Sequence, residues 1–313
     1  MVYIGIDLGG TNIAVGVVNE AGAILAEAST KTLAQRPYQE LVKDMADCAL
    51  KALEKAGLTV DDVKSIGIGI PGTANQEQGM VIFCTNLGWA NIPLRDELQK
   101  YINKPVFIDN DANVAALAEN FAGVSAGCKS SVLLTLGTGV GGGIILGGKA
   151  LNGVHGSGGE IGHMVLERNE TETCGCGKKG CAEQYCSASG VVKVAHRMLK
   201  KSFEPSVLRE RQDFTCKDVF DAAAAGDALA QEILEKVYSY MARLIADICA
   251  VVNPETVVIG GGVSKAGDVL LEGIDRYFHR FAFHAVRGVK FNLATLGNDA
   301  GAYGAFKLAL QEG

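Results

Sequence analysis

Residues 2–18, VYIGIDLGGTNIAVGVV, place two apolar strands on either side of a short glycine turn. The first strand ends in Asp7-Leu8-Gly9-Gly10-Thr11, and a second apolar run follows at residues 13–18. Two glycines leave the backbone N–H groups and the Thr11 hydroxyl free to face an anion such as a polyphosphate. A plain hairpin closed by a glycine turn is the alternative interpretation.

The same pattern returns at residues 131–146, SVLLTLGTGVGGGIIL. When Asp7 is set against Thr135, Leu8-Gly9 falls on Leu136-Gly137, and each turn opens onto another apolar strand. Such internal similarity indicates a repeated structural unit. It predicts two similar α/β halves with a cleft between them, with Gly137, Thr138 and Gly139 as a second phosphate-binding turn.

A third glycine cluster follows an apolar run at residues 256–259 and reads Gly260-Gly261-Gly262. Backbone without side chains would let a flat ring or a ribose lie against it. No Walker pattern is present, so the sequence excludes a P-loop.

Several further elements follow from periodicity and end signals. An apolar face predicts a helix over residues 39–56, stopped by Gly57, and a longer helix over 229–252, ended by Asn253-Pro254. A final helix from about residue 299 to 310 is expected to pack back on the first half. The uncharged run 130–148 raises the question of a membrane span, but its seven glycines favour a strand–turn–strand.

Composition limits the functional class. A chain of 313 residues is long enough for two domains. The net charge of −6, without a basic cluster, argues against nucleic-acid binding. Nine scattered cysteines and a first strand that starts at the N-terminus, with no signal peptide, lead us to expect a reducing cytoplasm.

A cysteine-rich segment, residues 158–186, reads GGEIGHMVLERNETETCGCGKKGCAEQYC. Cys174, Cys176 and Cys181 have a C-x-C-x4-C spacing, and His163 lies eleven residues upstream of the first of them. Three cysteines and one histidine are a common ligand set for structural zinc. A disulfide or buried free thiols are the alternatives, and Cys186 competes with His163 as the fourth ligand.

Polar residues at predicted loop positions indicate a substrate. Asp111 follows a short strand at residues 106–109 and begins a predicted helix, so it is either an N-cap or a general base that takes a proton from a substrate hydroxyl. Beside two phosphate turns we favour the base. Carboxylates, amides and an imidazole without a basic cluster suit a neutral polyol, and the set consists of Asn86, Asn110, Glu160, His163 and Glu183. Trp89 is interpreted as a loop anchor.

Together these residues resemble the ROK group of sugar kinases and repressors over essentially the whole chain. Asp7 to Thr11 resembles the phosphate-1 motif of the wider actin, sugar kinase and heat-shock ATPase fold. Leu136-Gly137-Thr138-Gly139 resembles phosphate-2, and Gly260-Gly261-Gly262 resembles the adenosine motif. Glu160-Ile161-Gly162-His163 followed by the three cysteines is the ROK signature. Within the family, Asn86-Leu87-Gly88-Trp89 is most similar to bacterial glucokinases.

The resemblance implies an α/β protein of two ribonuclease-H-like domains, of the actin and hexokinase type, that close on a sugar and ATP. The expected domains are residues 1–110 plus about 299–313, and residues 111–298 with a zinc loop at 158–186. It implies Asp111 as base, the polar set above on a neutral hexose, structural Zn²⁺ on His163 and the three cysteines, Mg²⁺ with ATP, and a homodimer. The implied nucleotide-binding residues are Asp7, Gly9, Gly10, Thr11, Asn12, Gly137, Thr138, Gly139, Gly261 and Gly262.

Two positions depart from the family pattern. Asn12 stands where many relatives carry lysine, so a cation near phosphate is lost, and Ala182 stands where a larger apolar residue is frequent. The expected activity is phosphorylation of glucose at the 6-hydroxyl. Alternatives are a kinase for N-acetylmannosamine, fructose, allose or mannose, a sugar-sensing repressor, and a heat-shock-type ATPase. Repressors carry a helix-turn-helix ahead of the first strand, and we expect none here because Asp7 lies so close to Met1.

Overall fold

The computed structural model describes residues 1–313, except for the side chain of Asn298. By compactness the chain separates into two units. The first unit is Met1–Lys129, Gly143–Gly159 and Thr295–Gly313, and the second unit is Ser130–Gly142 and Glu160–Ala294. The domain boundaries expected near residues 110 and 298 describe domains that move as rigid bodies, and they stay a prediction.

The first five-stranded sheet has the order β3-β2-β1-β4-β8. Strands β1, β2 and β3 are antiparallel, whereas β4 and β8 run parallel to β1. Alternating valine and isoleucine on these strands explains both the extended backbone and the burial of β1 and β4. The strands are β1 (Val2–Leu8), β2 (Asn12–Asn19), β3 (Ile24–Lys31), β4 (Val63–Ile70) and β8 (Val106–Asn110).

The second sheet repeats that order as β11-β10-β9-β12-β13, with β12 parallel to β9 and to β13. Gly69 lies opposite Asp7 in the first sheet, and Gly260 lies opposite Thr135 in the second. The predicted internal repeat is therefore confirmed, and Asp7 and Thr135 hold equivalent places in the two sheets. The strands are β9 (Ser130–Leu136), β10 (Val140–Leu146), β11 (Lys149–Ala150), β12 (Thr256–Gly260) and β13 (Lys290–Leu293).

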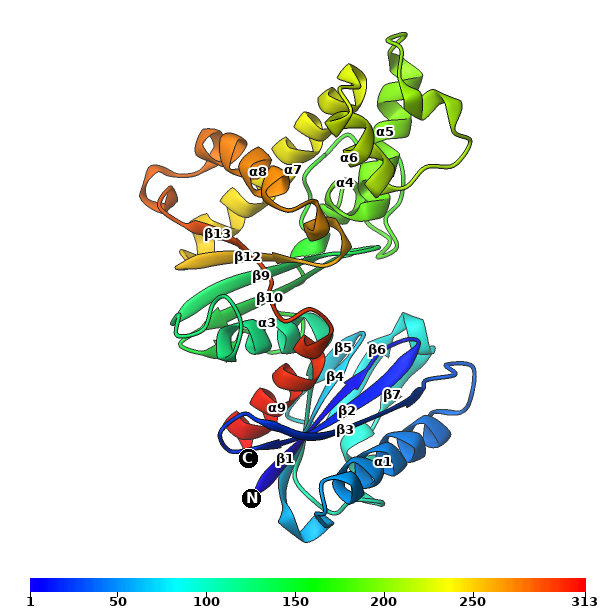
Figure 1. Ribbon diagram of the computed structural model, residues 1–313, viewed down its shortest axis with the longest axis vertical. Coiled ribbons are helices and arrows are strands. Elements are labelled where there is room, and N and C mark those ends of the chain that lie inside the picture. The colour runs from blue at the N-terminus through cyan, green and yellow to red at the C-terminus, as the bar shows by residue number, and fades with distance from the viewer. The chain divides into compact units, whose positions relative to one another are not determined.

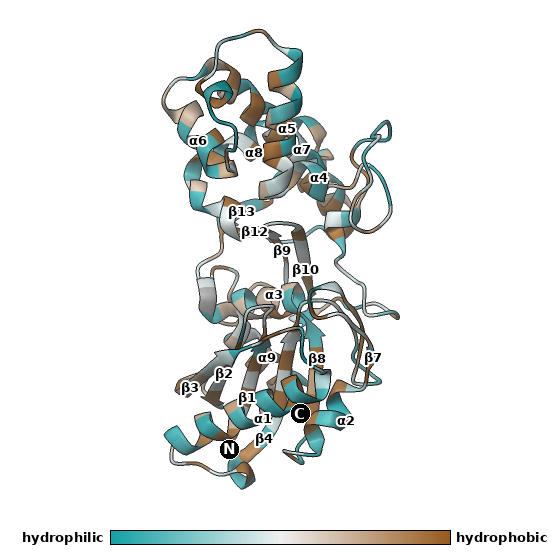
Figure 2. Cartoon of the chain, turned by 90° about the vertical axis from the view of Figure 1, so that its right-hand side faces the viewer, coloured by the Kyte–Doolittle hydropathy of each residue, from teal (hydrophilic) through white to brown (hydrophobic). Residues whose placement is uncertain are grey.

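Helices α1 and α9 cover the first sheet (Figure 1). Helix α1 (Tyr38–Lys55) buries Leu41, Met45 and Leu53 in the hydrophobic core beside the first sheet, while Figure 2 shows that its outer side is mostly hydrophilic. A short helix, α2 (Leu94–Gln99), and a three-stranded sheet of β5 (Thr73–Asn75), β6 (Met80–Cys84) and β7 (Trp89–Ile92) complete this region. Trp89 is buried and edge-on to Tyr38, which confirms it as an anchor.

The C-terminal helix α9 (Ala300–Glu312) packs on β1, β4 and α3 (Asp111–Phe121), so the prediction that it returns to the first half is confirmed. Phe306 is fully buried and makes edge-to-face contacts with Tyr3 and Phe121. The helix approaches β4 so closely that a Cβ on Gly67 would lie 1.9 Å from the carbonyl oxygen of Ala305. Only glycine fits at that crossing.

The second unit carries most of the remaining helices. The predicted long helix is α7 (Ala228–Val252), and it ends where Asn253 adopts a left-handed conformation with φ of 47°. The others are α4 (Glu183–Cys186), α5 (Ala188–Lys201), α6 (Cys216–Ala224) and α8 (Asp268–Phe281). The run 130–148 forms β9 and β10 as predicted. In the described part of the chain, no helix has the length and apolar character that crossing a bilayer requires.

Candidate functional site

Carboxylates stand at the carboxyl ends of two parallel strands of the first sheet. Asp7 on β1 and Asp109 on β8 lie in one register row, separated by Gly69 on β4. Burial raises the pKa of Asp7. Its Oδ2 lies 2.3 Å from the position that a Cβ on Gly301 would take, so the carboxylate sits at the first turn of α9, where the helix dipole favours negative charge.

The first glycine turn links β1 to β2. The Gly9 N–H donates to the Asn12 carbonyl at 3.0 Å, and the Thr32 hydroxyl donates to the Gly9 carbonyl at 2.6 Å. Gly10 and Thr11 are exposed, and the Thr11 carbonyl accepts the Thr32 N–H at 2.9 Å. Lys31 Nζ donates to Asn12 Oδ1 at 3.0 Å, which brings a cation to the turn from the neighbouring strand.

The second glycine turn links β9 to β10. The Gly137 N–H donates to the Gly139 carbonyl at 3.0 Å, and the start of α5 holds the turn through Ser189, whose hydroxyl donates to the Thr138 carbonyl at 2.7 Å. The Val140 N–H donates to Glu183 Oε2 at 3.2 Å. Glu183, expected on a sugar, therefore lies directly against this turn.

The third glycine cluster borders a cavity that the sequence did not predict. Gly261 has φ of 83° and turns the chain away from β12. Beside Gly262 lies a largely apolar cavity of about 360 Å³ in the second unit, walled by Val263, by Thr215 at the N-cap of α6, and by Cys216 and Phe220 of that helix. The available signal was the apolar pattern of residues 215–224, which sequence reasoning left unassigned.

At the β8–α3 junction, the N-cap is Asn110 rather than Asp111. Asn110 Oδ1 accepts the Ala112 N–H at 2.8 Å, and its amide nitrogen donates to the Gly72 carbonyl at 2.9 Å. Asp111 is the first residue of α3 and is exposed, with one oxygen also accepting the Ala112 N–H. Asn110 therefore supplies the N-cap, and Asp111 lies one residue further on, in the first turn of α3.

Asn86 lies in a 3-10 turn, Thr85–Leu87, and is exposed. A Cβ on Gly10 would lie 4.0 Å from the Asn86 Cβ. The structure therefore brings the predicted sugar-binding Asn86 next to the first glycine turn, within the first unit.

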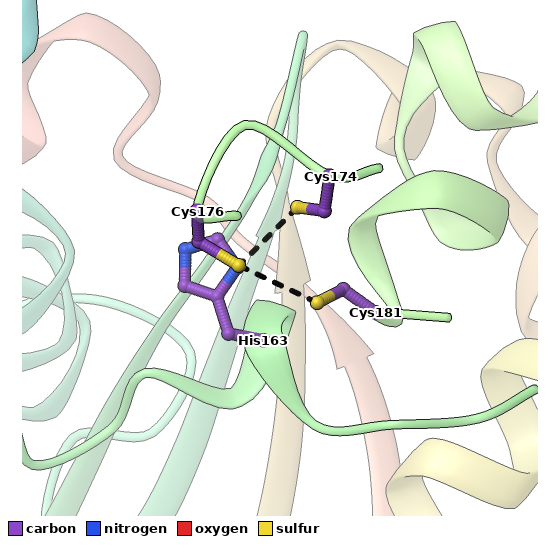
Figure 3. A group of neighbouring side chains, drawn as sticks. All are labelled: His163, Cys174, Cys176 and Cys181. Atoms are coloured by element: carbon purple, nitrogen blue, oxygen red, sulfur yellow. Dashed lines mark hydrogen bonds between the residues drawn. The ribbon is translucent and has the colours of Figure 1, made fainter. Parts of the chain in front are cut away.

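Four side chains of the cysteine-rich segment converge in the second unit (Figure 3). The ring nitrogen of His163 and the sulfurs of Cys174, Cys176 and Cys181 all lie within 4.8 Å of one another. The Cys176 and Cys181 sulfurs are 3.6 Å apart, close to the roughly 3.8 Å that two thiolates at 2.3 Å from a tetrahedral zinc would show. Cys186 is not in the group. The donor set and its spacing fit a structural zinc.

The three thiols lie close enough together to change one another's ionisation. Burial, together with the neighbouring Cys176 and Cys174 thiols, raises the pKa of Cys181 to about 12. Burial opposes ionisation of Cys176 as well, but hydrogen bonds from the Lys178 backbone and the adjacent thiols lower its pKa. Cys174 also contacts Glu183 Oε1 at 3.6 Å, so Glu183 joins the cluster to the second glycine turn.

Glu160 directly precedes the 3-10 turn Ile161–His163, and His163 is its last residue. Glu160 is exposed at its start, and its carbonyl accepts the His163 N–H at 3.1 Å. His163 turns Nδ1 toward the Cys174 sulfur at 3.8 Å, so its Nε2 takes no part in that contact. The second unit thus presents Glu160, His163 and Glu183 within one short stretch of structure.

Comparison with known proteins agrees with this geometry. Residues 3–312 match the ROK family. The chain is 40% identical over 314 residues to the glucokinase of Halalkalibacterium halodurans, covering 99% of this chain and 95% of that one. Among solved structures, the ROK hexokinase of Thermus thermophilus has a TM-score of 0.87 at 31% identity, covering 100% and 99% of the two chains. A ROK glucokinase of Streptomyces griseus in complex with glucose and AMPPNP has a TM-score of 0.77 at 33% identity, covering 99% and 100%.

Proposed function

The chain belongs to the ROK family, and on that premise we propose that it is an ATP-dependent hexose kinase that phosphorylates glucose at its 6-hydroxyl. The observation that carries the catalytic part is the exposed first-turn carboxylate of Asp111, whose helix is capped by Asn110. Support for the substrate comes from the Halalkalibacterium halodurans glucokinase and from the relative solved with glucose and AMPPNP.

Asp111 is the proposed general base. Its carboxylate takes the proton from the sugar hydroxyl as that oxygen attacks the terminal phosphorus of ATP. Hydroxyl groups donate and accept hydrogen bonds, so carboxylate and amide side chains can hold the sugar ring in one orientation. The proposed sugar contacts are Asn86, Asn110, Glu160, His163 and Glu183.

ATP is proposed to lie along the three glycine-rich turns. The residues are Asp7, Gly9, Gly10, Thr11 and Asn12 in the first, Gly137, Thr138 and Gly139 in the second, and Gly261 and Gly262 in the third. Lys31 supplies a cation at the first turn, where Asn12 replaces the lysine of many relatives. The cavity beside Gly262 has the apolar walls that an adenine ring needs. Mg²⁺ bound with ATP would neutralise phosphate charge, with Asp7 as its protein partner through water.

Zinc on His163, Cys174, Cys176 and Cys181 would give structural rigidity to the segment that holds the sugar contacts. Glu183 belongs to the same segment, and it also accepts the Val140 N–H of the second glycine turn. A sugar bound to Glu183 would therefore be held next to a phosphate-binding turn. A cytoplasmic homodimer completes the proposal, with light scattering as the check on its size.

The test is an ADP-release assay with ATP and Mg²⁺ across a panel of hexoses, on the wild type and on Asp111→Asn. We expect glucose to be preferred and Asp111→Asn to lower kcat by about 10²–10⁴-fold while sugar binding by calorimetry persists. Asp96→Asn is the matched control, because Asp96 is also an exposed carboxylate in the first turn of a helix.

Each other outcome assigns the function differently. Preference for N-acetylmannosamine, fructose, allose or mannose would keep the kinase and replace the substrate. No turnover on any hexose, with sugar binding intact, would make the protein a sugar sensor. A kcat for Asp111→Asn within about threefold of wild type would remove Asp111 as the base.

A further inference from the structure

A buried carboxylate two residues before the proposed base has no role in the mechanism above. Asp109 is the next-to-last residue of β8 and is 3% exposed. Its Oδ1 accepts the Asn110 N–H at 2.7 Å and the side-chain amide of Asn113 at 3.0 Å. One carboxylate oxygen therefore holds both the backbone immediately before Asp111 and the first turn of α3.

The contacts continue from the Asp109 carboxyl group through three side-chain amides. We call this chain of four residues the amide relay: Asp109, Asn113, Asn152 and Gln76. Asn113 Nδ2 also donates to Asn152 Oδ1 at 3.2 Å, and Asn152 Nδ2 donates to Gln76 Oε1 at 2.8 Å. All four residues belong to the first unit.

The relay joins three segments. Asp109 and Asn113 flank the junction that carries Asn110 and Asp111. Gln76 lies between β5 and β6, the hairpin that leads to Asn86. Asn152 belongs to residues 151–159, and a Cβ on Gly156 of that segment would lie 1.7 Å from the Ala74 carbonyl oxygen, so the segment rests directly on β5. The relay is thus the polar link among parts of the first unit that surround the proposed sugar contacts.

The relay also has an unusual balance of donors and acceptors. Among the described residues, Asp109 Oδ2 and Asn113 Oδ1 are buried without a hydrogen-bond partner, and no ion pair joins Asp109 to a cation. Two buried acceptors without a donor are costly, and an unpaired buried charge is costlier still. A protonated carboxyl group avoids that charge, because it offers one acceptor and one donor, as an asparagine side chain does. In agreement, burial raises the pKa of Asp109, and this effect outweighs the opposite effect of the Asn113, Asn110 and Asn152 groups that face its carboxylate.

We propose that Asp109 is a positioning residue that acts as a neutral hydrogen-bonding group and, through the amide relay, fixes the junction that carries Asp111. The proposal rests on the proposed function, since it concerns how the base is held. Its physical content is that Asp109 contributes the shape and the hydrogen bonds of a carboxyl group but no charge. Misplacement of a catalytic group by about 1 Å can cost about 10²-fold in rate.

The variants Asp109→Asn and Asp109→Ala separate these contributions. Asparagine keeps an acceptor for the Asn110 N–H and Asn113 and places a donor at the Oδ2 position, so we expect kcat within about fivefold of wild type. Alanine removes both, so we expect kcat to fall by about 10–100-fold and KM for the sugar to rise, with KM for ATP within about twofold. Asp111→Asn is the internal comparison, because the same substitution two residues away should lower kcat by about 10²–10⁴-fold.

A second variant covers the case in which Asp109→Ala does not fold. Asn152→Ala cuts the relay at a half-buried position, and we expect KM for the sugar to rise by about fivefold with KM for ATP unchanged. Equal loss of kcat in Asp109→Asn and Asp109→Ala would overturn the proposal, since it would show that charge is needed. Wild-type kinetics in both Asp109→Ala and Asn152→Ala would overturn it as well.

Hydrogen exchange at the Asn110 and Ala112 amides tests the relay independently of turnover. Protection should persist in Asp109→Asn and fall at least about tenfold in Asp109→Ala, with or without substrates. If the wild type phosphorylates no hexose, the proposed function fails while this measurement still decides whether Asp109 fixes the junction.

Discussion

Glu119 offers a test of how the first unit holds the returning chain. It lies on α3, is 2% exposed, and accepts four hydrogen bonds. Its Oε1 accepts the N–H groups of Thr295 and Leu296 at 2.8 and 2.9 Å, and its Oε2 accepts the Val124 N–H at 2.9 Å and the Thr295 hydroxyl at 3.2 Å. Residue 295 is where the chain re-enters the first unit, so one carboxylate fixes that entry.

The contacts set the size of the effect. Glu119→Ala leaves three backbone donors and one hydroxyl without their acceptor. The orphaned backbone groups are partly reachable by water, so we assign each lost bond about 1 kcal/mol and expect a loss of about 3–4 kcal/mol. Glu119→Gln keeps an oxygen for Thr295 and Leu296 and mismatches only the Oε2 side, where the Thr295 hydroxyl can rotate to accept. Its expected loss is about 1–2 kcal/mol.

Scanning calorimetry gives the stability of each variant, with about 2–4 °C of Tm expected per kcal/mol for a unit of this size. Amide hydrogen exchange supplies the local readout, because Thr295 and Leu296 should lose protection in Glu119→Ala and keep it in Glu119→Gln. Glu54→Gln, at an exposed site on α1, is the control for loss of one negative charge. Equal destabilisation by glutamine and alanine, or a loss below about 1 kcal/mol for alanine, would refute the reasoning.

Three further outcomes follow from features of the fold and site. Burial raises the pKa of Asp7 above its ordinary value of 3.8, so ionisation of Asp7 costs stability above the raised pKa and costs nothing below pH 3.8. Asp7→Asn should therefore raise Tm at pH 7 but not at pH 3, while turnover is lost. An unchanged or lower Tm at pH 7 would contradict this. The purified protein should contain about one zinc per chain by metal analysis, and Cys181→Ser should lose it; a zinc-free wild type that retains full activity would remove the metal site. Gly67→Ala should force α9 away from β4 and lower Tm by several degrees, whereas a wild-type melting curve would show that the crossing can relax.

Local signals accounted for much of the fold. The β-branched runs, the glycine turns and the helix end at Asn253 are all encoded within a few residues, so their elements could be predicted. The match of Asp7 to Thr135 predicted the internal repeat, because both turns follow the same strand in a repeated unit; the partner residues on β4 and β12 came only from the structure. The three-stranded sheet β5-β6-β7 was missed because strands of three to five residues leave too short a pattern.

In the candidate site, too, the features with a local sequence signal could be predicted and the long-range contacts could not. The metal ligands could be found because they lie within 19 residues of one another, from His163 to Cys181. The contact of Glu183 with Val140 joins residues 43 apart, and nothing in either segment indicates the other. The choice of Asn110 rather than Asp111 as N-cap is a one-residue shift between two good capping residues, which only the backbone conformation decides.

The position of α9 has a consequence for how the protein folds during its synthesis on the ribosome. Phe306 packs against Tyr3 and Phe121 in the interior of the first unit, yet it is translated 185 residues after Phe121. At about 5–20 residues per second, the nascent first unit waits roughly 10–40 s for its last helix. During that interval the face of β1 and β4 that α9 will cover is bare, while residues 130–294 can already have emerged and folded. The part of the chain that is synthesised first is therefore the part that most needs a chaperone.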